Sequence, residues 1–256
     1  MDFSVRSTVR FALACAVIDI RDSFRRSYLG PVWRSFASIT MIVLLGLFFG
    51  AIFKRSILDF DLYYLQLALG VLVWDFLSLS VNQSCSLFSS NLRSLRYTAQ
   101  PLPAFYLRIC LRNFFVFLLS IGIVLLIYSI SFDRPLGFSV SIFPGLFLLT
   151  LSVFAISTIV GIACARFRDL PQFVSWLTHI WFFLTPIIWP SDVLGRYQYL
   201  NDWNPAFHYV NLIRIPFTGR DSSEFSLLFA VVATAVALGA AVVLLRRFGN
   251  KVAYWI

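Results

Sequence analysis

The chain has 256 residues, of which 59% are hydrophobic and only 13% are charged, and 28 of them are phenylalanine. Soluble domains keep roughly a quarter of their residues charged, so this composition excludes an ordinary soluble domain and indicates one membrane domain over residues 1–256. The net charge of +9 is interpreted as a signal of topology and of contact with anionic lipid, rather than as a nucleic-acid-binding surface.

Residues 1–30 are predicted to form a helix that rests in the plane of the membrane surface. Apolar side chains recur there at spacings of three and four, whereas the charged residues lie mostly off this stripe. The pattern is typical of an amphipathic interface helix on the cytoplasmic leaflet. Leu29-Gly30-Pro31 then breaks the helix, because glycine is permissive and proline lacks a backbone donor. A plain membrane anchor and a guide for a substrate are both open as its role.

Six apolar runs follow, each close to the ~20 residues that cross a ~30 Å hydrocarbon core. They cover residues 32–53, 62–81, 105–130, 138–165, 173–189 and 225–245. Helices are expected, because backbone polar groups in lipid must be satisfied within each segment and the runs show no strand alternation. The predicted fold class is therefore an all-α integral membrane protein with six transmembrane helices.

Orientation follows from the positions of lysine and arginine. Most of the 21 such residues lie in the N-terminal segment, in the second and fourth loops, and in the C-terminal segment. With six spans these parts share one side of the membrane. The positive-inside rule therefore places both termini in the cytoplasm.

The loop after the second span, residues 84–103, contains Arg93, Arg96 and Tyr97. Leucines three apart share one face of this segment and the arginines share the next, which predicts a short amphipathic helix that ends before the prolines at 101 and 103. Such a helix suits docking to a soluble partner. Positive charge that only sets the topology is the competing account.

The loop after the fifth span, residues 190–224, contains an apolar stretch from Pro205 to Phe217 that is too short to cross a membrane. His208, Asn211 and Arg214 interrupt it. Short re-entrant half-helices that dip into the outer leaflet are expected here, since irregular backbone at that depth must be covered by protein. A loose extracellular loop is the alternative.

Asp75 is the one carboxylate that falls deep within a predicted span. Intramembrane carboxylates either face a polar path or hydrogen-bond to a neighbour. Here the neighbour is Asn82 or Gln83, about two turns away, or a group on another helix. Both readings are open from the sequence alone.

Several catalytic patterns are missing. No G-x-x-x-x-G-K-[ST] run is present, and Lys54 and Lys251 are the only lysines, so this chain is not expected to hydrolyse ATP. G-x-S-x-G, H-E-x-x-H and C-x-x-C are also missing. The four cysteines are scattered through apolar sequence, so they are interpreted as reduced packing residues and no metal site is predicted.

Several short motifs stand in a specific order along nearly the whole chain. They are Arg25-Arg26-Ser27-Tyr28-Leu29-Gly30-Pro31-Val32-Trp33 before the first span, Arg166-Phe167-Arg168-Asp169-Leu170 after the fourth, Phe183-Leu184-Thr185-Pro186-Ile187 in the fifth, and Asn204-Pro205 with Arg214-Ile215-Pro216-Phe217 outside. Together they resemble the permease subunit of ABC exporters for polysaccharides. The ending Val252-Ala253-Tyr254-Trp255-Ile256 is more similar to the O-antigen branch than to the capsule branch.

The resemblance implies a transport subunit that is not itself an enzyme. A homodimer would pair with two copies of a separate nucleotide-binding ATPase, which binds ATP and magnesium, while this chain holds no cofactor. The cargo would be a lipid-linked polysaccharide that crosses the bacterial inner membrane from its cytoplasmic side. In this family the second loop couples to the ATPase, which here implies Arg93, Arg96 and Tyr97.

The resemblance also implies that the first and fifth spans line the path, with the turn before the first span at its entrance. The corresponding residues are Leu29, Gly30, Trp33, Phe36, Phe48, Phe49, Trp176, Trp181, Phe182 and Phe183. Residues seven apart lie nearly on one stripe of a helix, so Trp176 and Phe183 are expected to face one way and Trp181 and Phe182 another. A bend at Thr185-Pro186 is expected to change the aperture.

Three alternatives remain from the sequence. The cargo of an exporter of this kind is also consistent with a capsule or teichoic-acid-type polymer. A membrane-embedded glycan or lipid transferase would be aromatic and arginine-rich too, but it should present clustered carboxylates or histidines, whereas His179 and His208 stand apart. A self-contained channel or carrier would work without an ATPase.

Overall fold

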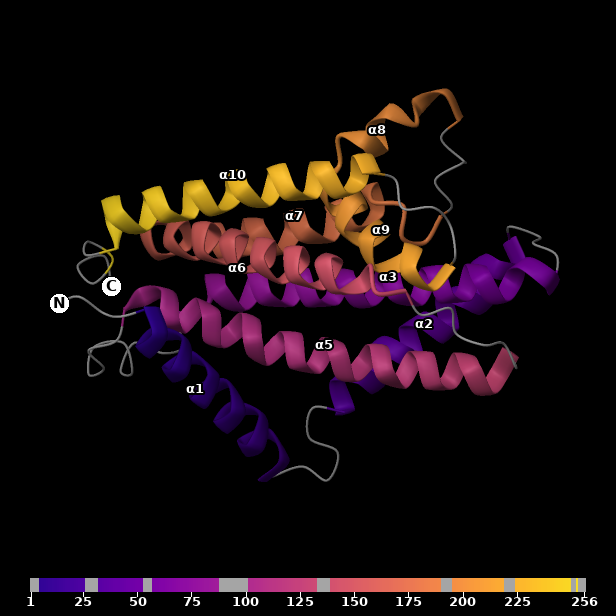
Figure 1. Cartoon of the computed structure of the whole chain (residues 1–256), viewed down its shortest axis with the longest axis horizontal. Coiled ribbons are helices and arrows are strands. Elements are labelled where there is room, and N and C mark those ends of the chain that lie inside the picture. Colours follow the sequence, from indigo (N-terminus) through magenta and orange to yellow (C-terminus); the bar gives the residue numbers. More distant parts are fainter. Residues whose placement is uncertain are drawn as a thin grey trace.

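The computed structural model describes residues 5–25, 32–52, 57–87, 101–132, 139–189, 195–218 and 224–249, together with Val252. Within these ranges the regular secondary structure is helical throughout (Figure 1). The helices are α1 (Val5–Arg25), α2 (Val32–Ile52), α3 (Ile57–Cys85), α5 (Leu102–Phe132), α6 (Ile142–Arg166), α7 (Leu170–Leu184), α8 (Tyr199–Asp202), α9 (Pro205–Thr218) and α10 (Glu224–Phe248). The all-α class is confirmed for this part of the chain.

Four of the described helices are long and apolar enough to cross a membrane. They are Asp61–Cys85, Leu102–Phe132, Ile142–Arg166 and Glu224–Phe248, and they correspond to the second, third, fourth and sixth predicted spans. Within α2, Ser35–Ala51 is a shorter apolar helix, and α7 has 15 residues. A topology of six spans therefore stays a prediction for the first and fifth runs.

α3 is the central helix of the bundle, because it packs against α2, α5, α6, α7 and α9. The most apolar stretch of α3 is 67% buried, whereas the most apolar stretch of α10 is 17% buried. α10 packs on α6 and α9 at the periphery. Figure 1 shows α10, α6, α3 and α5 running along the long axis of the molecule. The amino end of α1 and the carboxyl end of α10 lie at the same end of the bundle.

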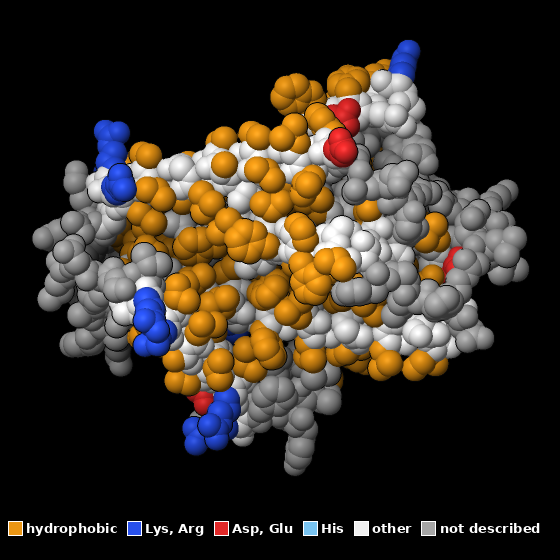
Figure 2. All heavy atoms as spheres, viewed as in Figure 1, with side chains coloured by type: hydrophobic (Ala, Val, Ile, Leu, Met, Phe, Trp, Pro, Cys, Tyr) orange, Lys and Arg blue, Asp and Glu red, His pale blue; other side chains and the backbone are white. Residues whose placement is uncertain are grey.

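The outer surface of the bundle is apolar. Figure 2 shows hydrophobic side chains over the middle of this face, while most of the lysine and arginine side chains in view lie toward the end where α10 finishes. On α10 alone, Leu228, Val232, Val236 and Val243 are each more than half exposed. Exposed apolar patches of this extent are typical of a surface that meets lipid or another protein.

α1 is an amphipathic helix that packs against α5. Ala12 and Ala16 are buried in this contact, and the ring of Phe11 meets Phe105 edge-on at 6.2 Å between centroids. Val17 and Ile18 are exposed on the other side. The predicted helix thus exists over Val5–Arg25, and its depth in the membrane stays a prediction.

α7 ends at Leu184, within the run 173–189 that was predicted as the fifth span. Thr185 takes an extended conformation, with its N–H donating to the carbonyls of Trp181 and Phe182. Pro186 follows and has no N–H to continue the helical ladder. The expected bend at Thr185-Pro186 is therefore a helix end, after which the chain runs in turns to Trp189.

The stretch from Pro205 to Phe217 is helical, as α9 extends over Pro205–Thr218. It packs against α3, α6 and α10, and Tyr209, Val210 and Ile213 are buried in these contacts. His208 is fully buried between the hydroxyl of Ser226 and the carbonyl of Asp202. A loose loop is thereby excluded for residues 205–218, whereas insertion into the outer leaflet stays a prediction.

Candidate functional site

α2 presents an aromatic face to the outside of the bundle. Trp33, Phe36 and Phe48 are each 58–64% exposed, and the rings of Trp33 and Phe36 stack with centroids 5.8 Å apart. Phe49 differs, because it packs against the buried core and meets Phe48 edge-on. Three of the four aromatic residues predicted on this helix therefore share its outer face.

The aromatic residues of α7 divide by helical angle. Trp176 and Phe183 are 63% and 66% exposed, whereas Phe182 is buried with its ring 5.8 Å from that of Trp74 on α3. Trp181 packs partly against the core and donates its Nε1–H to Asn204 Oδ1 at 3.0 Å. The outward face of α7 thus carries two of the four predicted path residues.

Five other predicted site residues lie outside the described residues. They are Leu29 and Gly30, which precede α2 in the sequence, and Arg93, Arg96 and Tyr97, which lie between α3 and α5 in the sequence. Their roles at the entrance of the path and in ATPase coupling stay predictions.

A polar stripe runs along α3, formed by Asp75, Ser78 and Asn82, which lie three and seven positions apart and so share one face. The Ser38 hydroxyl on α2 donates to Asp75 Oδ2 at 2.5 Å. The Asn82 amide donates to Thr178 Oγ1 on α7 at 3.3 Å and to the Ser78 carbonyl at 2.7 Å. These contacts place the stripe between α2 and α7. Of the alternatives for Asp75, a hydrogen-bonding group on another helix is present.

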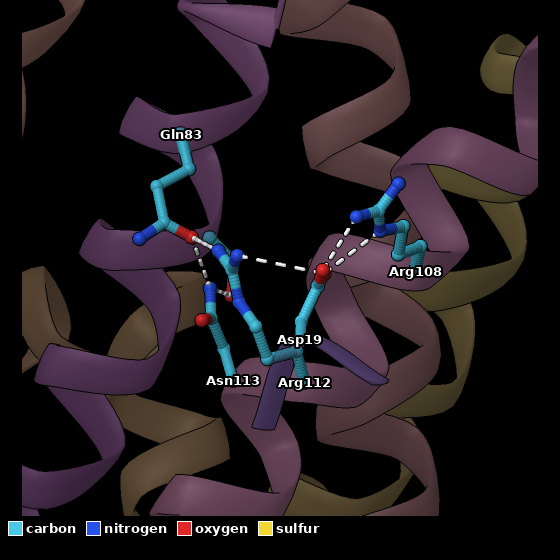
Figure 3. Close-up of polar contacts among 6 residues, drawn as sticks. Asp19, Gln83, Arg108, Arg112 and Asn113 are labelled. Carbon is cyan, nitrogen blue, oxygen red and sulfur yellow. Dashed lines mark hydrogen bonds and ion pairs between the residues drawn. The ribbon is translucent and has the colours of Figure 1, made fainter. Parts of the chain in front are cut away.

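A second polar group joins α1, α3 and α5 (Figure 3). Asp19 accepts hydrogen bonds from both Nε, at 2.7 Å, and Nη2 of Arg108. Arg112 Nη1 lies 3.7 Å from Asp19 Oδ2, and Arg112 Nη2 donates to Gln83 Oε1 at 2.6 Å. Asn113 donates to the same Gln83 oxygen at 2.8 Å. A charged network therefore ties the interface helix to two helices of the bundle.

The sequence analysis did not predict this network, because Arg108 and Arg112 entered it only among the lysine and arginine residues that indicate the orientation in the membrane. The available signal was their spacing of four, which puts both guanidinium groups on one face of a helix. Asp19 was a further signal, because a carboxylate beside an apolar stripe needs a partner when it is partly buried. Which helix supplies the partner depends on the tertiary structure.

The described residues include no group of three or more His, Cys, Asp or Glu side chains arranged to hold a metal ion. Cys15, Cys85, Cys110 and Cys164 are all free. The arrangement on α2, α3 and α7 instead offers broad aromatic faces beside a strip of hydroxyl, amide and carboxylate groups. Such surfaces suit weak, repeated contact with a polar ligand more than bond-making chemistry.

Comparison with known proteins gives the chain a family. The profile described as ABC-2 type transporter matches residues 12–218, from within α1 to the end of α9. An O-antigen export system permease protein RfbA of Myxococcus xanthus is 27% identical over 180 residues, which cover 69% of this chain and 66% of that relative. A Klebsiella pneumoniae protein of the same name is 25% identical over 193 residues, which cover 73% of this chain and 72% of the relative.

The matched region is most of the chain. It contains three of the four helices that are long and apolar enough to cross a membrane, α3, α5 and α6, together with the aromatic faces of α2 and α7 and the polar groups of α3. The fold agrees with the match, because an all-helical bundle with an apolar exterior is what a membrane permease requires. The chain therefore belongs to the ABC-2 type transporter family.

Proposed function

We propose that this chain is the membrane-spanning permease subunit of an ATP-driven exporter that moves a lipid-linked, O-antigen-like polysaccharide from the cytoplasmic side across the inner membrane. The observation that carries the proposal is the family match over residues 12–218 together with relatives named as O-antigen export permeases. In this proposal two copies of the chain form the path. Two copies of a separate ATPase bind ATP and magnesium and supply the energy.

The path is proposed to run between the outward faces of α2 and α7 and the partner subunit. Aromatic faces give a long glycan broad contact without holding any one sugar tightly. The polar stripe of Asp75, Ser78 and Asn82 adds groups that exchange hydrogen bonds with sugar hydroxyls. α10 differs from these helices, because its exposed large hydrophobic side chains beyond Phe225 are all aliphatic, which suits contact with lipid chains.

The second loop is proposed to dock on the ATPase through Arg93, Arg96 and Tyr97. Replacing both arginines with glutamate should uncouple ATP hydrolysis from export while the permease stays in the membrane, because charge reversal acts at a docking surface. Arg196→Glu is the matched control, since Arg196 is exposed in the loop after α7, on the opposite predicted side. Unchanged export and unchanged co-purification of the ATPase in the double variant would refute the coupling assignment.

The whole proposal is tested by removing the chain from cells and locating the glycan. An exporter predicts that complete lipid-linked glycan accumulates at the cytoplasmic face and that the wild-type chain restores its export. A transferase predicts instead that the lipid-linked glycan is never completed. A self-contained carrier predicts that export continues when the Walker lysine of the partner ATPase is replaced. Either of the last two results would overturn the proposal.

A further inference from the structure

We propose that Arg214 is a positioning residue that, with Asn204 and Tyr63, anchors the outer end of α7 to α9 and α3. α7 is then the fixed wall of the path, and the path widens by movement of α2. The inference rests on the proposed function, because it takes α2 and α7 as the walls. It concerns the way in which the walls are held, which the family match does not address.

The end of α7 leaves backbone carbonyls that need partners. The last turn of any helix has carbonyls without an intrahelical donor, and here the chain continues through Pro186 in turns rather than as a helix. Thr185, Pro186, Ile187 and Ile188 are all buried. A buried carbonyl without a donor is costly, above all in a membrane where water does not supply one.

Arg214 supplies these donors from α9. Its Nη1 donates to the Pro186 carbonyl at 2.8 Å and its Nη2 to the Ile187 carbonyl at 3.2 Å. Its Nε donates to the Gln66 carbonyl on α3 at 2.7 Å. A guanidinium offers five N–H groups in a rigid planar fork, so one side chain joins three segments in a defined geometry. Its positive charge also meets the negative end of the α7 dipole.

Gly70 on α3 makes room for this guanidinium. A Cβ atom placed on Gly70 would meet Arg214 Nη2 at 2.2 Å and Arg214 Cζ at 3.0 Å. The first separation is far too short for a real contact, so a side chain at position 70 would force the guanidinium to shift away from the carbonyls. A substitution at Gly70 therefore perturbs the same anchor from a different helix.

Two further side chains hold the same segment. Asn204 donates to Thr185 Oγ1 at 3.0 Å and accepts from the Trp181 indole at 3.0 Å. Tyr63 on α3 donates its hydroxyl to the Ile188 carbonyl at 2.8 Å. Hydrogen bonds from α9 and α3 thus reach residues 181, 185, 186, 187 and 188 in succession. A segment held at that many points moves with α3 and α9 as one body.

α2 is held in another manner. Among the contacts described for α2, two hydroxyl groups join it to neighbouring helices: Ser35 Oγ lies 2.7 Å from Ser120 Oγ on α5, and Ser38 donates to Asp75. Side-chain packing adds to its contact with α3, as where Gly46 lies against the ring of Tyr64. Packed helices slide past one another by small shear movements more readily than a charged network rearranges.

The test measures distances within one subunit of the purified complex with its ATPase. Spin labels are placed at Phe183→Cys and Leu228→Cys, or at Phe48→Cys and Leu228→Cys, in a background without the four native cysteines. All three positions are exposed. Dilution with unlabelled chain isolates the distance within a subunit. During ATP hydrolysis we expect the 48–228 distance to shift while the 183–228 distance stays narrow and unchanged. A 183–228 distance that shifts as much as the other overturns the inference.

Variants then assign the anchor to Arg214. Arg214→Met should broaden the 183–228 distribution and lower export, and Arg214→Lys should restore part of both losses. Gly70→Ala should broaden the same distribution with Arg214 still present, so it serves if Arg214→Met does not fold. Arg196→Met is the control, because this exposed guanidinium contacts only Tyr197 among the described contacts. A folded Arg214→Met or Gly70→Ala with a narrow, wild-type distribution refutes the anchor.

Failure of the inference is distinguishable from failure of the proposed function. The distances are read during ATP hydrolysis in the purified complex, and they need no glycan. If the cargo is not a polysaccharide, glycan export is lost as a readout while the distance comparison still decides whether α7 is fixed.

Discussion

α2 and α7 share a chemical character and differ in their attachment. Both turn exposed aromatic side chains outward, with Trp33, Phe36 and Phe48 on one helix and Trp176 and Phe183 on the other. The segment at the carboxyl end of α7 meets the guanidinium of Arg214 on α9, the amide of Asn204 just before α9 and the phenol of Tyr63 on α3. The contacts described between α2 and its neighbours are two from serine hydroxyls, together with side-chain packing. α2 and α7 are therefore expected to move differently although their exposed surfaces are similar, because the contacts that attach a helix to its neighbours determine how far it moves.

The largest expected effect comes from removing the Asn204 side-chain amide, which joins the end of α7 to α9. Asn204 caps α9 through the Ala206 N–H at 3.1 Å and also joins Trp181 and Thr185. Asn204→Ala removes a helix cap and two side-chain hydrogen bonds, so it should lower the free energy of unfolding by about 2 to 4 kcal/mol. Thermal unfolding in detergent, followed by circular dichroism, measures the loss.

Asn204→Asp is the matched control for that variant. It keeps the oxygen that accepts from Trp181 and Ala206, loses the donor to Thr185, and adds a negative charge that the amino end of α9 favours. Its loss should be about 1 kcal/mol. Equal losses for the two variants would show that the cap and the indole contact contribute little, and that α7 is held less firmly than its contacts indicate.

Thiol labelling tests which side chains of α7 face the proposed path. In a background without the four native cysteines, single cysteines at 176 and 183 should react with a water-soluble reagent in the working complex, and more so during ATP hydrolysis. Cysteines at 181 and 182 should be protected, because Phe182 is buried and Trp181 packs against the core. Equal labelling at all four positions, or none, would remove α7 from the path.

A smaller effect is expected where the polar stripe meets α2. Asp75→Asn keeps an oxygen that accepts from Ser38 but removes the negative charge, so export should fall severalfold with normal amounts of protein in the membrane. Ser38→Ala removes one hydrogen bond to that carboxylate and should cost about 1 kcal/mol of stability. Export at the wild-type level in Asp75→Asn would mean that the negative charge does not contribute to export and that the side chain serves only in packing.

The smallest effect concerns the attachment of α1, which precedes α2 in the chain. Asp19 contacts Arg108 through two hydrogen bonds and Arg112 at 3.7 Å. A double-mutant cycle of Asp19→Asn with Arg108→Gln should give a coupling of about 1 kcal/mol, and the cycle with Arg112→Gln only a few tenths. Chemical denaturation of the purified protein measures both, and a larger coupling for Arg112 would contradict the geometry.

Much of the architecture follows from local sequence pattern. Long apolar runs predict helices because lipid leaves the backbone no other donors or acceptors, and α3, α5, α6 and α10 appear where those runs lie. Periodicity likewise predicts α1, and a short apolar stretch predicts α9. Even the division of Trp176 and Phe183 from Phe182 follows from helical spacing. These features depend on neighbours within about two turns.

The tertiary structure alone decided the contacts between distant residues. Pro186 predicts from the sequence that a helix is interrupted. The anchor at this point depends on Arg214, which lies 28 positions away and donates to the Pro186 carbonyl. The partner of Asp75 lies 37 positions away on α2, and that of Asp19 lies 89 positions away on α5. Local periodicity states which face of a helix a side chain occupies. The helix that covers this face is set by the packing of the whole bundle, because buried polar groups must find donors and acceptors wherever the chain brings them together.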